Sequence, residues 1–180
     1  MRRLGMTGIA AATLAAAAVL GGASAHAQFA SEIEAYESGA NALADAQRDV
    51  TQRAIDEANR ALKAKDYARA RRYAATVTRA DPKRVESWLL LGAAQQGLGD
   101  WSAARRTYTT AVRIAPKHPE ARAGLGMAYA HTGDPKAAAE LAWLAGQVAE
   151  CDGCWRASQL TGWKTALEAA IQATPAAGSR

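Results

Sequence analysis

Apolar residues recur three and four positions apart in successive stretches of this chain, and short turns containing glycine, aspartate or proline separate the stretches. This spacing places the apolar side chains on one face of an α-helix. Alanine supplies much of the apolar share and aromatic residues make up only 6% of the chain, which favours closely packed helices over a bulky β core. The chain has no strand pattern. We therefore predict an all-α fold.

The first residues follow a different pattern, because Arg2 and Arg3 precede an apolar run that ends in small residues. A basic start, an apolar centre and an A-x-A exit are typical of a secretory signal peptide. We predict a signal peptide at 1–27, cleaved after Ala27, and a periplasmic or secreted bacterial protein. The run is shorter than the roughly 20 apolar residues of a membrane-spanning helix, so we expect no stable membrane insertion after cleavage.

A repeated pattern with a period of about 34 residues organises the rest of the chain. The pairs Asp66-Tyr67, Asp100-Trp101 and Asp134-Pro135 follow one another at this constant interval. Each pair is followed three residues later by an alanine: Ala70, Ala104 and Ala138. The apolar spacing is helical on both sides of each turn, so we predict three helix-turn-helix units at 51–84, 85–118 and 119–152.

The second unit carries the most specific pattern: Trp88, Leu91, Gly92, Ala104, Tyr108, Ala111 and Pro116, with Gln95 at a position that is usually aromatic. These residues resemble the tetratricopeptide repeat family. The third unit keeps Leu125, Gly126, Tyr129, Ala138 and Ala145, and the first keeps Ala58, Ala70 and Pro82. The resemblance implies a right-handed solenoid of about three repeats. We expect the small residues Ala58, Gly92 and Gly126 to face Ala70, Ala104 and Ala138, so that paired helices approach closely.

The array also needs ends that cover its apolar faces. Apolar residues recur at helical steps between 153 and 173, at Leu160, Trp163, Leu167 and Ile171, and predict a capping helix. Residues 174–180 are expected to form a disordered tail. Residues 28–50 carry a weaker apolar stripe (Ile33, Tyr36, Ala40 and Leu43) and predict a leading helical segment, either a separate helix or one continuous with the first repeat.

The resemblance also implies a binding groove, because the first helices of such units line a concave face that accepts an extended peptide or a helix. The equivalent positions here are Gln52, Ile55, Asn59, Lys63, Glu86, Leu89, Ala93, Gln96, Glu120, Ala123, Met127 and Ala130. The alternative for Ile55, Leu89 and Met127 is that they only pack under neighbouring helices.

A second candidate surface follows from the register of the second helices. Basic residues occupy equivalent positions in the first two units and form the predicted basic stripe: Arg71, Arg72, Arg79, Lys83, Arg105, Arg106, Arg113 and Lys117. Such a stripe can meet anionic lipid, polysaccharide or an acidic partner. The alternative is an ordinary solvated face.

Cys151 and Cys154 form a C-x-x-C pair just before the predicted capping helix. Exported proteins meet an oxidising environment, which favours a structural disulfide. The alternatives are a redox-sensitive thiol pair or a metal site. Haem attachment needs a histidine where Trp155 stands, and zinc needs about four ligands, for which only His118 and His131 are available besides the pair. We therefore predict no bound metal.

No acid-base pair, nucleophile motif or glycine-rich phosphate loop is recognisable, so we expect neither an enzyme nor a cofactor. The function predicted is a scaffold or adaptor of the bacterial cell envelope that binds another envelope protein. Nucleic acid is not an expected partner, because export removes the protein from it. Two alternatives stay open: a thiol-disulfide redox protein using Cys151 and Cys154, and a self-assembling structural protein. The oligomeric state is left open.

Overall fold

A computed structural model describes residues 23–151 and 153–174. The predicted signal peptide lies outside the described residues up to position 22, and so do positions 175–180 of the predicted tail. The described residues form seven α-helices and no strand. The helices are α2 (Ala23–Lys63), α3 (Tyr67–Ala80), α4 (Val85–Gly97), α5 (Trp101–Ile114), α6 (Pro119–His131), α7 (Ala137–Glu150) and α8 (Ala157–Ala173).

The chain divides into two compact units, residues 1–49 and 50–180. The predicted leading segment belongs to α2, which runs without a break into the first repeat. Within the first unit, Tyr36 and Leu43 of the weak apolar stripe are exposed. Among the described residues, no helix combines the length and the hydrophobicity needed to cross a membrane.

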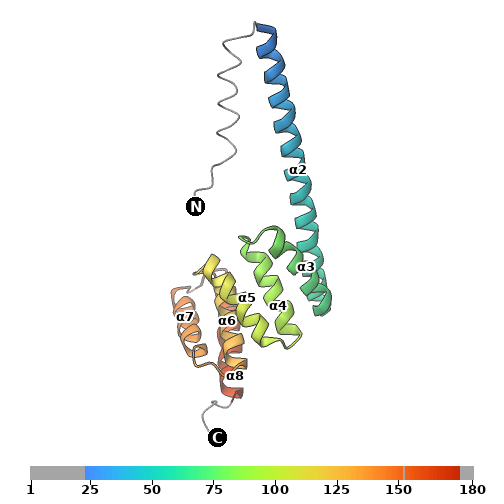
Figure 1. Ribbon diagram of the computed structural model, residues 1–180. Helices are drawn as coiled ribbons and strands as arrows, with labels where there is room; N and C mark the ends of the chain where they lie inside the picture. Colours follow the sequence, from blue (N-terminus) through green and yellow to red (C-terminus); the bar gives the residue numbers. More distant parts are fainter. Residues whose placement is uncertain (1–22, 152, 175–180) are drawn as a thin grey trace, which may run out of the picture. The chain divides into compact units, whose positions relative to one another are not determined.

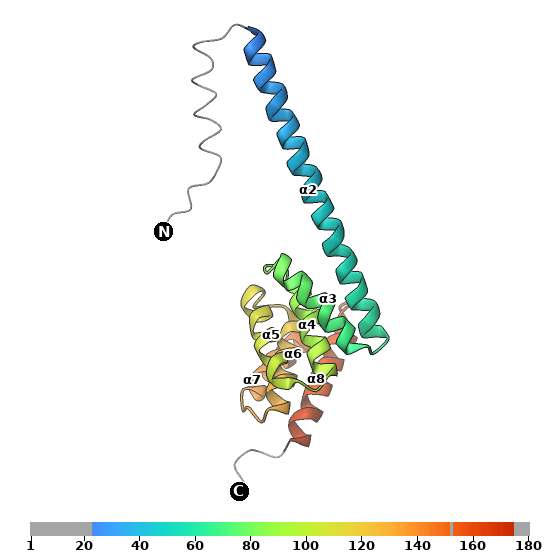
Figure 2. The same cartoon turned by 45° about the vertical axis from the view of Figure 1, so that its right-hand side comes forward.

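The second unit is a stack of helix pairs (Figures 1 and 2). The end of α2 pairs with α3, α4 with α5, and α6 with α7, so each of the three predicted repeats contains two helices. Consecutive helices from α3 to α7 contact one another, and α4 also contacts α6. This arrangement is the predicted all-α tetratricopeptide-type solenoid, in which each repeat packs mainly against its neighbours.

Aspartates at the turns start the second helices of the first two repeats. The Oδ1 atom of Asp66 accepts a hydrogen bond from the backbone N–H of Arg69, and Asp100 does the same for Ala103, both at 3.0 Å. These bonds satisfy amide groups that have no partner within the helix. Before α5, Gly99 adopts a φ of +76°, which glycine reaches at little cost.

The third turn differs because Pro135 follows Asp134. Here Asp134 Oδ1 accepts from the N–H of Lys136, and the next amides bond three residues back, Ala137 to Asp134 and Ala138 to Pro135. These i to i+3 hydrogen bonds make a tighter turn, so the regular α-helix starts later in the sequence and its first side chains point in different directions. Ala137 is buried and Ala138 is exposed, so the prediction that Ala138 packs against Gly126 is wrong.

Small residues make room for a buried aromatic ring at the centre of the repeats. Ala58, Ala70 and Ala104 are fully buried. A Cβ atom at Gly92 would lie 2.6 Å from the ring of Tyr108, and one at Gly124 would lie closer still. These glycines therefore allow α4 and α6 to approach the tyrosine of α5.

Helix α8 covers the last repeat by packing against both α6 and α7. Leu160 and Leu167 are buried, and Trp163 and Ile171 pack at the edge of the same cluster as Leu167. The glycine at position 126 leaves room for α8, because a Cβ atom there would lie 2.6 Å from Leu167. The apolar end of the stack is thus protected from water.

Candidate functional site

The predicted groove residues lie on α2, α4 and α6, the first helices of the three repeats. Their exposure follows the position within the repeat. The first position of each set is exposed, at Gln52, Glu86 and Glu120. Asn59, Ala93 and Met127 are half-buried at the third position, and Lys63 is exposed.

The second position of each set is buried, so the prediction that it lines the groove is wrong. Ile55 is 1% exposed, Leu89 7% and Ala123 4%. Ile55 packs with residues of α3 and α4, Leu89 with α5 and α6, and Ala123 with α7 and α8. This face of every first helix therefore packs against the following helices, as the alternative interpretation held for Ile55 and Leu89. Ala130 is buried in the same cluster as Ala123.

Gln96 forms a hydrogen bond inside the protein and does not only face the groove. Its Oε1 atom accepts a hydrogen bond of 2.6 Å from the hydroxyl of Tyr108. A buried hydroxyl without such a partner would destabilise the fold. The accessible part of the predicted groove, here called the groove face, therefore consists of Gln52, Asn59, Lys63, Glu86, Ala93, Glu120 and Met127.

The groove face is acidic where α4 and α6 begin. Glu86 and Glu120 occupy equivalent positions in successive repeats. The pKa of Glu120 is raised, chiefly because the surrounding protein displaces water from its carboxyl group. His118 and Arg156 act in the opposite direction, and the negative charge of Glu86 adds to the increase. A cationic partner group at this place would relieve the repulsion between the two carboxylates.

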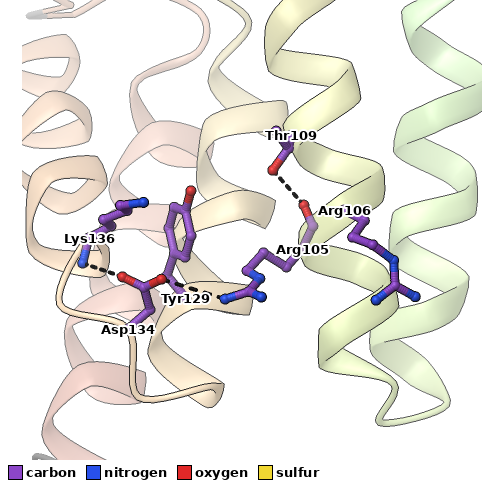
Figure 3. A pocket seen from close by; sticks show the side chains of 6 residues that line it. All are labelled: Arg105, Arg106, Thr109, Tyr129, Asp134 and Lys136. Carbon is purple, nitrogen blue, oxygen red and sulfur yellow. Dashed lines mark hydrogen bonds and ion pairs between the residues drawn. The ribbon is translucent and has the colours of Figure 1, made fainter.

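The residues of the basic stripe all lie at the surface; only Arg105 among them is half-buried. Two hollows are lined by arginines of the stripe, and they are named here by the helices that carry most of their lining. The α3–α4 pocket has a volume of about 520 Å³ and is lined by Arg71, Arg72, Ala75, Thr76, Arg79, Leu91 and Gln95. The α5–α6 pocket, shown in Figure 3, has about 390 Å³ and is lined by Arg105, Arg106, Thr109, Tyr129, Asp134 and Lys136. Sequence reasoning identified the arginines but not these hollows.

The two cysteines form a disulfide in the turn between α7 and α8. Their Cα atoms are 5.2 Å apart, within the usual range for a disulfide. This agrees with the predicted structural bond, and a bond of this kind is not evidence of a redox function. Within the described parts of the chain, no three His, Cys, Asp or Glu residues lie close enough to hold a metal ion.

Comparison with known families agrees with the geometry. Two sequence profiles described as tetratricopeptide repeat match the chain, one over residues 61–112 and one over 92–147. A search of curated proteins gave no match. The matched segments cover α3 to α6 and most of α7, the helices that form the stack. The chain is a tetratricopeptide repeat protein.

Proposed function

We propose that this protein is a non-catalytic adaptor of the bacterial cell envelope, which binds a segment of another envelope protein on its groove face. Tetratricopeptide repeats generally mediate protein-protein interactions and are typically non-catalytic. The predicted signal peptide supports the location in the envelope.

The observation that carries the proposal is the composition of the groove face. Exposed Glu86 and Glu120 stand at one end of α4 and α6, and the half-buried Ala93 and Met127 lie further along the same two helices. A partner segment with basic and apolar residues at helical or extended spacing would match both parts of this face. Methionine adapts well to different apolar partners because its side chain is flexible.

A charge reversal tests this proposal. The mature protein is used to capture partners from the native envelope fraction by crosslinking, beside a Glu86→Lys variant. Glu86 is exposed, and reversing its charge removes the repulsion with Glu120, so the variant should stay folded by circular dichroism. The matched control is Glu150→Lys, which makes the same charge change at the exposed end of α7.

We expect the wild type and the Glu150→Lys control to capture the same specific partner, and the Glu86→Lys variant to lose most of it. Equal capture by all three proteins would contradict the assignment of the groove face.

A further inference from the structure

The α3–α4 and α5–α6 pockets are the same structural site in two successive repeats. Arg71 and Arg72 stand one full repeat before Arg105 and Arg106, and Gln95 stands one full repeat before Tyr129. In both sites the second helix of one repeat supplies the arginines and the first helix of the next supplies the floor. The molecule therefore contains two versions of one site that can be compared directly.

The two floors differ. In the α5–α6 pocket, the ring of Tyr129 stands between Arg105 and Lys136 (Figure 3). In the α3–α4 pocket, the smaller Gln95 takes its place, and the volume is about 520 Å³ instead of 390 Å³. The Gln95 Oε1 atom is buried and has no hydrogen-bond partner in the described structure. The protein itself thus leaves this carbonyl oxygen without a fixed partner, which is uncommon for a buried polar atom.

The charges differ as well. In the α5–α6 pocket, a guanidinium nitrogen of Arg105 lies 3.6 Å from a carboxylate oxygen of Asp134, and the other oxygen accepts from the N–H of Lys136 (Figure 3). That site contains its own acid. The residue equivalent to Asp134 is Asp100, which caps α5 and does not line the α3–α4 pocket.

The arginines of the α3–α4 pocket have no such acid. Among the described residues, no ion pair joins Arg71, Arg72 or Arg79 to a carboxylate. Arg79 donates only to the backbone oxygen of Ala75, within its own helix. Three cations therefore line a hollow that contains no negative side chain.

We infer that the α3–α4 pocket binds a glutamate side chain from an acidic segment of a partner protein. Guanidinium groups bind carboxylates through paired, charge-assisted hydrogen bonds, which are stronger than neutral ones. Leu91 and Ala75 offer apolar contacts to the two methylene groups of glutamate. A sugar acid would bring hydroxyl groups against these apolar atoms, and burying an unpaired hydroxyl is unfavourable.

This inference rests on the proposed function only in taking the partner to be a protein; the site is separate from the groove face. Asp134 shows what the pocket accepts, because the chain supplies a carboxylate to the equivalent site from its own turn. The partner would supply the missing carboxylate in the first site.

The test is a fluorescence anisotropy titration of the folded mature protein with a labelled hexaglutamate peptide, acetylated and amidated at its ends. We expect saturable binding that weakens with salt. The Arg71→Gln/Arg72→Gln double variant should bind at least about tenfold more weakly, since the loss of even one charge-assisted bond to the carboxylate has about that effect. The control double variant, Arg106→Gln/Arg113→Gln, removes the same charge from the next repeat and should change binding by less than about twofold, the effect of a distant screened charge.

A variant that changes the shape of the pocket but not its charge shows whether binding depends on the pocket or only on a basic surface. Gln95→Tyr installs the residue that the third repeat carries at this position and fills the floor while keeping every arginine. We expect it also to weaken hexaglutamate binding about tenfold, because the tyrosine ring would fill the space that the two methylene groups of a glutamate side chain need. Unchanged binding by Gln95→Tyr, or by the Arg71→Gln/Arg72→Gln variant, would overturn the inference.

Two further probes test the class of ligand: an oligogalacturonate of equal charge and vesicles containing phosphatidylglycerol. If either binds more tightly than the peptide and loses binding in Gln95→Tyr, the peptide assignment is wrong. No binding of hexaglutamate to the wild type would also overturn it. Glu86→Lys should leave hexaglutamate binding intact, so failure of this inference is distinguishable from failure of the groove proposal.

Discussion

Tyr108 lies at the centre of the packing between the second and third repeats. Its ring is buried between Gly92 of α4 and Gly124 of α6, and its hydroxyl donates to Gln96. The sequence pattern included both Tyr108 and Gly92, but it predicted that Gly92 faces Ala104. It did not single out Gly124, because that glycine lies outside the repeat positions by which the family is identified.

Gly124→Ala should destabilise the protein by about 1 to 3 kcal/mol, because the new methyl group would overlap the buried ring. The matched control is Gly146→Ala in α7, where a Cβ would have no neighbour within 4 Å. The control should stabilise by about 0.5 to 1 kcal/mol, since alanine is the better helix former. Urea unfolding measures both. Equal effects of the two substitutions would contradict the packing described for Tyr108.

The ionisation of Tyr108 also predicts a pH dependence. Burial raises the pKa of its phenol well above the ordinary value of about 10, and the charge of Glu120 raises it further. The stability this gives is fully present below about pH 10 and is lost as the pH rises from there towards the folded pKa. The melting temperature of the wild type should therefore fall more steeply between pH 9 and pH 11 than that of Tyr108→Phe. Parallel curves for the two proteins would contradict this environment for Tyr108.

At the scale of elements, most of the fold could be predicted because its signals repeat. Helical spacing and an aspartate before the second helix recur in every repeat, and a proline follows the second helix in the first two. Helices α3 to α7 therefore fall within the predicted units, while α2 begins well before the first unit. The error at Ala138 arose because Pro135 changes the hydrogen bonding of one turn, an effect that the period alone does not reveal.

The groove was only partly predictable. Helical spacing shows that Ile55, Leu89 and Ala123 lie on the equivalent face of three different helices. It does not show that the following helices cover this face. The pockets were missed for a related reason, because their floor and their walls come from different repeats. Gln95 could have indicated the α3–α4 pocket, since it replaces an aromatic residue that would fill the floor of this pocket.

The packing of helix α8 predicts how much a truncated side chain there destabilises the protein. Leu167 is fully buried against Gly126 of α6, so Leu167→Ala should cost about 2 to 5 kcal/mol by removing contacts and leaving a cavity. The control Thr165→Ala changes an exposed residue of the same helix and should alter stability by less than about 0.5 kcal/mol. Thermal unfolding followed by circular dichroism measures both. A loss below about 0.5 kcal/mol for Leu167→Ala would show that α8 does not cap the stack.

At the scale of the whole molecule, the repeat unit offers chemically different surfaces. The groove face is acidic at Glu86 and Glu120, while the α3–α4 pocket is basic at Arg71 and Arg72. A partner that contacted both surfaces would need segments of opposite charge, and two linked contacts bind more tightly than either alone. Electrostatic complementarity of this kind mainly increases specificity and the rate of association.

The central claim, protein binding on the groove face, is tested most directly by site-specific photo-crosslinking. Gln52→Cys and Ala138→Cys each add one labelling site for a benzophenone maleimide at an exposed residue, because both native cysteines are held in the disulfide. Gln52 lies on the groove face, and the change leaves Glu86 and Glu120 in place. After irradiation in the native envelope fraction, we predict one specific crosslinked protein from position 52 and none from position 138. The same products from both positions, or none from position 52, would contradict the account.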